Sequence, residues 1–358
     1  MPVSRRALLA SAGAALAPAA EIAPVKLPGK VRLGILDVLG HLGDVTSHLK
    51  DAPDVEVAAV AVPEAADFNR LSRNARVKGA KHYTDWRRML DSEKLDMVAV
   101  CNANGPRAEA ILACLDRKLH VIAEKPLALT RGDLNKIRAK LNGSGVKLTT
   151  ILPMRFSPPY LALQQLAASG AIGEVINITT QKSYKAGDRP RWMKDQKTYG
   201  GTIPWIGIHM IDLMRFCSGR ECTEAFSYRA QVKAPAGIGE MENTTGTIFR
   251  LDNQGVGTLH MDYCRPESAP THGDDRLRMA GTKGVLEYMA ATGVTLLEEG
   301  KKPEVVTKLP TEGSVFLDFL EHVYHKKPTA LPFHDIYQAN LITIAAQEAA
   351  VSGKPVKV

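Results

Sequence analysis

Between residues 31 and 151 the chain alternates short apolar runs with stretches of helical periodicity, and this alternation constrains its fold most strongly. Five apolar runs are predicted as strands, at 31–36, 55–62, 97–101, 120–123 and 146–151. Strands that are apolar throughout and alternate with helices are typical of a parallel sheet covered on both faces. The sequence therefore predicts a doubly wound α/β domain. Thr84 and Thr130 are predicted as helix caps within it.

The pattern changes after Pro153, where a helix at 159–169 is followed by segments of alternating polarity. Such alternation predicts a mainly antiparallel sheet with one solvated face. The predicted strands are 175–183, 224–232, 244–251, 256–263 and 276–280, and two helices near 315–325 and 335–352 close the chain. We therefore expect one domain over 30–152 and a second over 153–358, its last helix packing back on the first.

The composition of the 358-residue chain is that of an ordinary globular protein, with 45% hydrophobic residues. It excludes a disordered protein, a collagen-like fibre and a small disulfide scaffold. The net charge of +8 is spread along the chain, so we expect no nucleic-acid partner. Mild basicity can still attract an acidic ligand. Five cysteines without a C-x-x-C pair indicate no metal site, although Cys217 and Cys222 could pair in an oxidising compartment.

Residues 1–20 have the order of an export signal: a basic start, a mildly apolar stretch and small residues at Ala17 and Ala19. The pair Arg5-Arg6 is similar to the twin-arginine signal. We therefore expect an exported, periplasmic protein. Because twin-arginine export carries folded proteins, the signal also indicates a tightly held cofactor. No later apolar stretch is long enough to span a membrane.

The loop after the first strand occupies the position of a dinucleotide-binding fingerprint but differs from it in amino-acid sequence. Asp37 and Leu39 stand where the first two glycines of G-x-G-x-x-G are expected, while Gly40 and Gly43 remain. The second strand ends at Val62, without the usual ribose-binding acid. The loop alone leaves open a doubly wound domain that binds no nucleotide, and it does not distinguish NAD from NADP.

Residues 120–128, which read HVIAEKPLA, resemble the signature of the glucose-fructose oxidoreductase and inositol dehydrogenase (Gfo/Idh/MocA) family. Further segments match in the family's order and spacing, so the resemblance covers nearly everything after residue 30. They are 96–100, 154–158, 189–192, 199–201, 207–213 and 280–284.

The resemblance implies a Rossmann-like dinucleotide-binding domain joined to an α/β domain with an open sheet, and sugar or polyol substrates. It implies catalytic roles for Lys125, which would stabilise a developing alkoxide, and for His209, which would accept the hydroxyl proton. The cofactor would be tightly bound NAD or NADP, with no metal. The implied cofactor-binding residues are Asp37, Leu39, Gly40, His41, Asn102, Asn104, Glu124, Lys125 and Arg155.

Many members of the family place an Asp four residues before this histidine, where this chain has Trp205. An indole can stack on a sugar but cannot accept a proton. Asp212 could orient His209 or pair within the structure, and Asp188, Asp274 or Asp275 could replace the missing carboxylate. The predicted substrate-contacting residues are Tyr184, Trp192, Trp205, Asp212 and His272.

The favoured interpretation is an exported NAD(P)-dependent oxidoreductase that acts on a sugar, polyol or related hydroxy compound in a cleft between the domains. One alternative is an NAD-dependent glycoside hydrolase or lyase that works by transient oxidation. A second is a non-catalytic, carbohydrate-binding paralogue, because Asp37, Leu39 and Trp205 depart from the pattern. The resemblance also implies a homo-oligomer.

Overall fold

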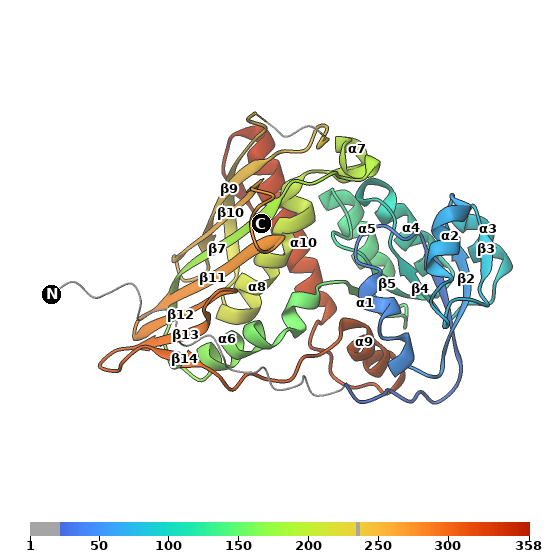
Figure 1. Ribbon diagram of the computed structural model, residues 1–358, viewed down its shortest axis with the longest axis horizontal. Coiled ribbons are helices and arrows are strands. Elements are labelled where there is room, and N and C mark those ends of the chain that lie inside the picture. The colour runs from blue at the N-terminus through green and yellow to red at the C-terminus, as the bar shows by residue number, and fades with distance from the viewer. Residues whose placement is uncertain (1–21, 234–236) are drawn as a thin grey trace.

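The computed structural model describes residues 22–233 and 237–358, so the predicted export signal lies outside the described residues. Figure 1 shows an α/β unit beside a long open sheet, and helices α6, α8 and α10 lie between them. This arrangement leaves one face of the long sheet uncovered by helices.

The first unit is a six-stranded parallel sheet in the order β3-β2-β1-β4-β5-β6, which confirms the predicted architecture. The order reverses between β1 and β4, and ligands of such sheets bind in the crevice at the carboxyl ends of those strands. The elements are β1 (Val31–Leu36), α1 (Gly43–Thr46), β2 (Val55–Ala61), α2 (Ala65–Leu71), β3 (Lys81–Tyr83), α3 (Trp86–Ser92), β4 (Met97–Val100), α4 (Asn104–Asp116), β5 (His120–Ala123), α5 (Arg131–Leu141) and β6 (Leu148–Thr150).

The second unit contains a nine-stranded sheet in the order β14-β13-β12-β11-β7-β10-β9-β8-β15. Its pairs are antiparallel except β7 with β10, so the mainly antiparallel prediction is confirmed. Its elements are α6 (Pro158–Ala168), β7 (Val175–Lys185), α7 (Gln196–Tyr199), α8 (Ile208–Ser218), β8 (Cys222–Ala230), β9 (Thr244–Leu251), β10 (Val256–Arg265), β11 (Gly273–Gly281), β12 (Gly284–Met289), β13 (Gly293–Glu298), β14 (Glu304–Val306), α9 (Val315–Tyr324), α10 (Phe333–Ser352) and β15 (Val356–Lys357).

The two closing helices tie the units together. Phe316 and Phe319 of α9 are buried in the same apolar cluster as residues of β1 and β2. On α10, Asn340 Oδ1 accepts a hydrogen bond of 2.8 Å from the backbone N–H of Leu127, just after β5. The walls of a site between the units are therefore held by direct contacts.

The predicted caps have different outcomes. Thr130 accepts a hydrogen bond from the N–H of Asp133 and caps α5, as predicted. The Thr84 prediction is wrong, because α3 begins one residue later and Asp85 accepts from the N–H of Arg87. A carboxylate at this position competes successfully with the hydroxyl before it.

All five cysteines lie in the described residues and are free thiols, with Cys217 and Cys222 both buried. The helices in the described part of the chain include none that is long and apolar enough to cross a membrane.

Candidate active site

Two cavities lie at the carboxyl edge of the parallel sheet, and Gly40 lines both of them. One, of about 230 Å³, is lined from the first unit by Gly40, His41 and Lys125 and from the second by residues that include His209. The other, of about 270 Å³, is lined by Gly40 and by residues of α1 and α2. The loop after β1 therefore borders both cavities.

Lys125 follows β5 and brings a buried amine to the first cavity. Its Nζ donates a hydrogen bond of 2.6 Å to the carbonyl of Trp205 and lies 3.3 Å from the centroid of the Trp205 ring. Glu124 Oε1 is 3.9 Å from the same Nζ. Burial lowers the pKa of Lys125 to about 7, although the Glu124 carboxylate opposes this shift.

Glu124 is a buried carboxylate whose charge is balanced by its neighbours. Its Oε1 lies 2.5 Å from Nδ1 of His41. Burial opposes ionisation, but the charges of His41, Lys125 and Arg107 prevail and lower the pKa of Glu124 to about 2. The Glu124 carboxylate therefore holds the loop after β1 against the end of β5.

His209 lies on α8 with a buried ring, and its Nδ1 has no hydrogen-bond partner among residues 22–233 and 237–358. Burial lowers the pKa of His209 well below its usual value, and the nearby charges of Lys125, Lys182 and His41 lower it further. The ring centroid of His41 lies 6.0 Å away. The arrangement gives the cavity a neutral imidazole that can accept a proton.

Glycine is required at position 40 by two features of the loop. Its φ of +72° is in the left-handed region, and a Cβ there would lie 2.5 Å from Glu124 Oε1. We expect G40A to weaken cofactor binding at least tenfold, because the loop must move away from Glu124. Binding of NADH is measured by fluorescence titration. G79A is the matched control, since a Cβ at Gly79 meets nothing within 4 Å and Gly79 lines neither cavity. Equal affinity of G40A and wild type would contradict the prediction.

Asp37 adopts a φ of +65°, a conformation that Asp tolerates better than most residues. Its Oδ1 accepts a hydrogen bond of 2.7 Å from the N–H of Val38, and the N–H of Leu39 donates to the Cys101 carbonyl at 2.9 Å. Burial raises the pKa of the Asp37 carboxyl. The loop thus keeps a glycine-like turn without its first two glycines.

The two asparagines after β4 differ in their contacts. Asn104 donates a hydrogen bond of 2.6 Å to the Tyr199 carbonyl and accepts one of 2.8 Å from Arg107, which ties the units together. Asn102 is buried, and its Oδ1 has no partner in the described parts of the chain. Asn102 follows β4, at the crevice between β1 and β4 where sheets of this kind bind a dinucleotide.

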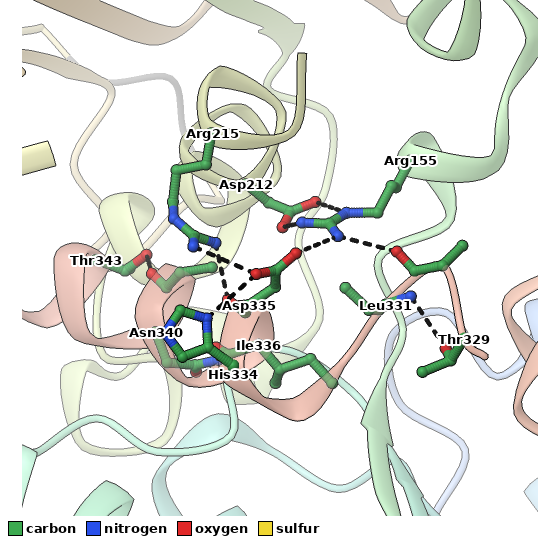
Figure 2. Close-up of polar contacts among 12 residues, drawn as sticks. Arg155, Asp212, Arg215, Thr329, Leu331, His334, Asp335, Ile336, Asn340 and Thr343 are labelled. Atoms are coloured by element: carbon green, nitrogen blue, oxygen red, sulfur yellow. Dashed lines mark hydrogen bonds and ion pairs between the residues drawn. The ribbon is translucent and has the colours of Figure 1, made fainter. Parts of the chain in front are cut away.

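The structure corrects the expectation that Arg155 contacts the cofactor. Figure 2 shows its guanidinium between two carboxylates, with Nε 3.0 Å from Asp212 Oδ2 and Nη1 2.8 Å from Asp335 Oδ2. Nη2 donates to Asp212 Oδ1 at 2.5 Å. Every guanidinium nitrogen is engaged within the protein, and both Asp212 oxygens bind Arg155. Asp212 therefore pairs with Arg155 within the structure and does not orient His209.

The second unit supplies the opposite wall of the first cavity. Tyr184 of β7 and His272 stack with ring centroids 5.2 Å apart, and both line the cavity together with Trp205. Trp192 instead packs edge-on against Trp205, with centroids 5.0 Å apart, and does not line this cavity.

Sequence reasoning missed Lys182 and Arg189. Nζ of Lys182 is buried and lies 2.7 Å from both Tyr184 Oη and Asp275 Oδ2. Lys182 lies four residues after Ile178 on β7, so the two side chains point to the same, buried face of the sheet. Strand alternation could therefore have predicted that Lys182 is buried. Arg189 follows β7 and lines the cavity. In the described residues no group of three or more His, Cys, Asp or Glu side chains is arranged to hold a metal ion.

Two family models match the chain. Residues 38–151 match the oxidoreductase family with an NAD-binding Rossmann fold, and residues 160–287 match the Gfo/Idh/MocA C-terminal domain. Among curated proteins, a myo-inositol 2-dehydrogenase from Thermotoga maritima is 25% identical over 91% of this chain and 98% of its own length.

Solved structures agree with these matches. A candidate oxidoreductase from Thermotoga maritima is 32% identical, with a TM-score of 0.85 over 92% of this chain and 100% of that one. Levoglucosan dehydrogenase in complex with NADH and L-sorbose, 17% identical, has a TM-score of 0.79 over 92% of this chain and 99% of that one, and shows the fold alone. The chain belongs to the Gfo/Idh/MocA family and is an NAD(P)-dependent oxidoreductase of that type.

Proposed function

We propose that the chain oxidises a hydroxyl group of a sugar, polyol or related compound in the cavity that Lys125 and His209 line. The observation that carries the proposal is the convergence of these two side chains, one from each unit, on one cavity beside the loop after β1. NAD or NADP, when bound, supplies the hydride acceptor. Gly40 and Asn102 are the residues that we expect to border it.

Lys125 and His209 have complementary tasks in this proposal. The ammonium group of Lys125 stabilises negative charge that develops on the substrate oxygen, since a buried cation acts strongly where water is excluded. The neutral imidazole of His209 accepts the hydroxyl proton. The backbone carbonyl of Trp205 accepts a hydrogen bond from the Lys125 amine and orients it.

The pH dependence of oxidation tests this division of tasks. Because the pKa of Lys125 is about 7, its charged form is lost as the pH rises above 7. Since the pKa of His209 lies well below its usual value, His209 is already in its base form there. We expect kcat/KM for oxidation to fall about tenfold per pH unit above the Lys125 pKa. A rate that instead rises through pH 7 would assign the role of base to Lys125.

Turnover with the substrates of relatives tests the proposal directly. The purified chain is assayed at 340 nm with NAD and NADP against myo-inositol, D-xylose and levoglucosan, the compounds in the names of relatives. Reduction of the cofactor by at least one hydroxy compound is expected. Cleavage of a glycoside without net reduction would favour transient oxidation, and no turnover with any of them would favour a carbohydrate-binding protein.

We also propose that residues 1–20 direct export to the periplasm, as the arginine pair and the small residues before Glu21 indicate. The cofactor is then bound tightly before export. Cell fractionation is expected to find the mature chain in the periplasm.

The outer face of the long sheet supports a homo-oligomer. Exposed apolar side chains on its strands include Ile176, Tyr228, Ile248 and Val256. Apolar patches of this kind are typical of interfaces. Light scattering is expected to give a multiple of the monomer mass.

A further inference from the structure

The wall of the first cavity is rich in basic side chains. Of the described residues that line it, five are basic and none carries a carboxylate: His41, Lys125, Arg189, His209 and His272. Lys and Arg can only donate hydrogen bonds, whereas a neutral sugar hydroxyl both donates and accepts. The two side chains that can only donate, Lys125 and Arg189, match a ligand that presents acceptors.

Arg189 is the cation of this wall that the oxidation itself does not use. Its guanidinium lies 4.6 Å from the centroid of the Tyr263 ring, and its Nη2 donates a hydrogen bond of 2.6 Å to the Lys185 carbonyl. Its Nε is buried and has no partner among the residues that the structure describes. The guanidinium is therefore held in place by two contacts. Its Nη1 donates no hydrogen bond within the described residues and is not among the buried atoms, so it is the donor left for a ligand.

The carboxylates near Arg189 pair with other cations. Each of three candidate acids forms its own ion pair and leaves the charge of Arg189 uncompensated. The pairs are Asp188 with Lys194 at 2.8 Å, Asp274 with Arg276 at 2.7 Å, and Asp275 with Lys182 at 2.7 Å.

The charges around the cavity also shift the pKa values of His209 and Lys125. Apart from burial, the cations Lys125, Lys182 and His41 lower the pKa of His209, and Arg107 and Lys182 lower that of Lys125. Glu124 and Asp44 oppose the shift at Lys125. An anion in the cavity would offset the excess positive charge. The cavity has a volume of about 230 Å³.

We propose that the substrate is a monosaccharide acid or a similar carboxylated polyol, and that Arg189 binds its carboxylate through the guanidinium. The proposal rests on the function proposed above, whose cavity it uses. A carboxylate accepts charge-assisted hydrogen bonds from Arg, which are stronger than bonds between neutral partners. The geometry thus separates two tasks: Arg189 selects the acid, and Lys125 with His209 acts on the hydroxyl.

The test compares two pairs of probes: D-glucuronate with D-glucose, and D-gluconate with D-glucitol. Binding to the full chain is measured by calorimetry at low salt, with and without NADH. Each acid is expected to bind at least tenfold more tightly than its neutral partner. R189Q is expected to remove this preference while leaving the affinity for the neutral probes within twofold.

R276Q is the matched control, because Arg276 lies on β11 outside the cavity and pairs with Asp274. It is expected to keep the preference. R189K retains the charge and is expected to keep part of the preference if R189Q fails to fold. Equal affinity within each pair, tighter binding of the neutral member, or binding of neither acid overturns the proposal. Failure of NADH to bind, with the acid preference intact, would count against the proposed oxidation alone.

Discussion

Replacing Lys125 with Met is expected to lower kcat/KM for oxidation by about 10²–10³-fold. The side chain nearly keeps its length but loses the ammonium group that Lys125 brings to the cavity. Removal of one preorganised group that stabilises developing oxyanion charge has an effect of this size in other enzymes. Initial rates at 340 nm with saturating cofactor measure it.

The control for this substitution is K136M, because Lys136 is an exposed lysine of α5 that pairs only with Asp133. K136M is expected to match wild type in rate. NADH binding to K125M is expected to stay within a few fold, which separates a catalytic loss from a lost cofactor site. A K125M rate within tenfold of wild type would show that Lys125 does not stabilise the reacting oxygen.

The largest expected loss of stability comes from D212A. Asp212 is buried and binds the Arg155 guanidinium through both of its oxygens. Removing one partner of a buried ion pair leaves the other charge uncompensated and costs about 3–5 kcal/mol in the free energy of unfolding. Asp335 still holds Nη1 of Arg155, so the loss falls toward the lower end of this range. Urea unfolding measures it.

E348Q is the matched control for D212A. Glu348 pairs with Arg131 at 2.9 Å, and both side chains are partly exposed. Such a pair contributes less than about 1 kcal/mol. D212A is expected to keep its kcat wherever it remains folded, because neither Asp212 nor Arg155 lines the catalytic cavity. If D212A were as stable as wild type but had a low kcat, the result would indicate that Asp212 orients His209.

The parallel sheet was predictable because each of its central strands is a continuous apolar run bounded by helical periodicity. The edge strand β3 was missed, since Lys81–Tyr83 is only three residues long and shows no alternation. The same applies to β14, of three residues. Such short strands are defined by pairing with a neighbour, which local sequence does not reveal.

Parts of the site depend on distant partners in the same way. Local patterns and the family resemblance brought out Lys125 and His209, which the structure places on one cavity. Arg155 was assigned to the cofactor because its partners Asp212 and Asp335 lie 57 and 180 residues away. Arg189 stood within a recognised motif, but its unpaired Nε becomes visible only when its neighbours are placed.

The cofactor content of the folded protein tests the central claim most directly. The purified chain is denatured, and the supernatant is analysed for NAD and NADP by mass spectrometry. Near-stoichiometric nicotinamide dinucleotide is expected, because Gly40 lines two cavities at the carboxyl edge of the parallel sheet, where such sheets bind dinucleotides. A folded protein that contains neither dinucleotide and binds neither when it is added would contradict the oxidoreductase function.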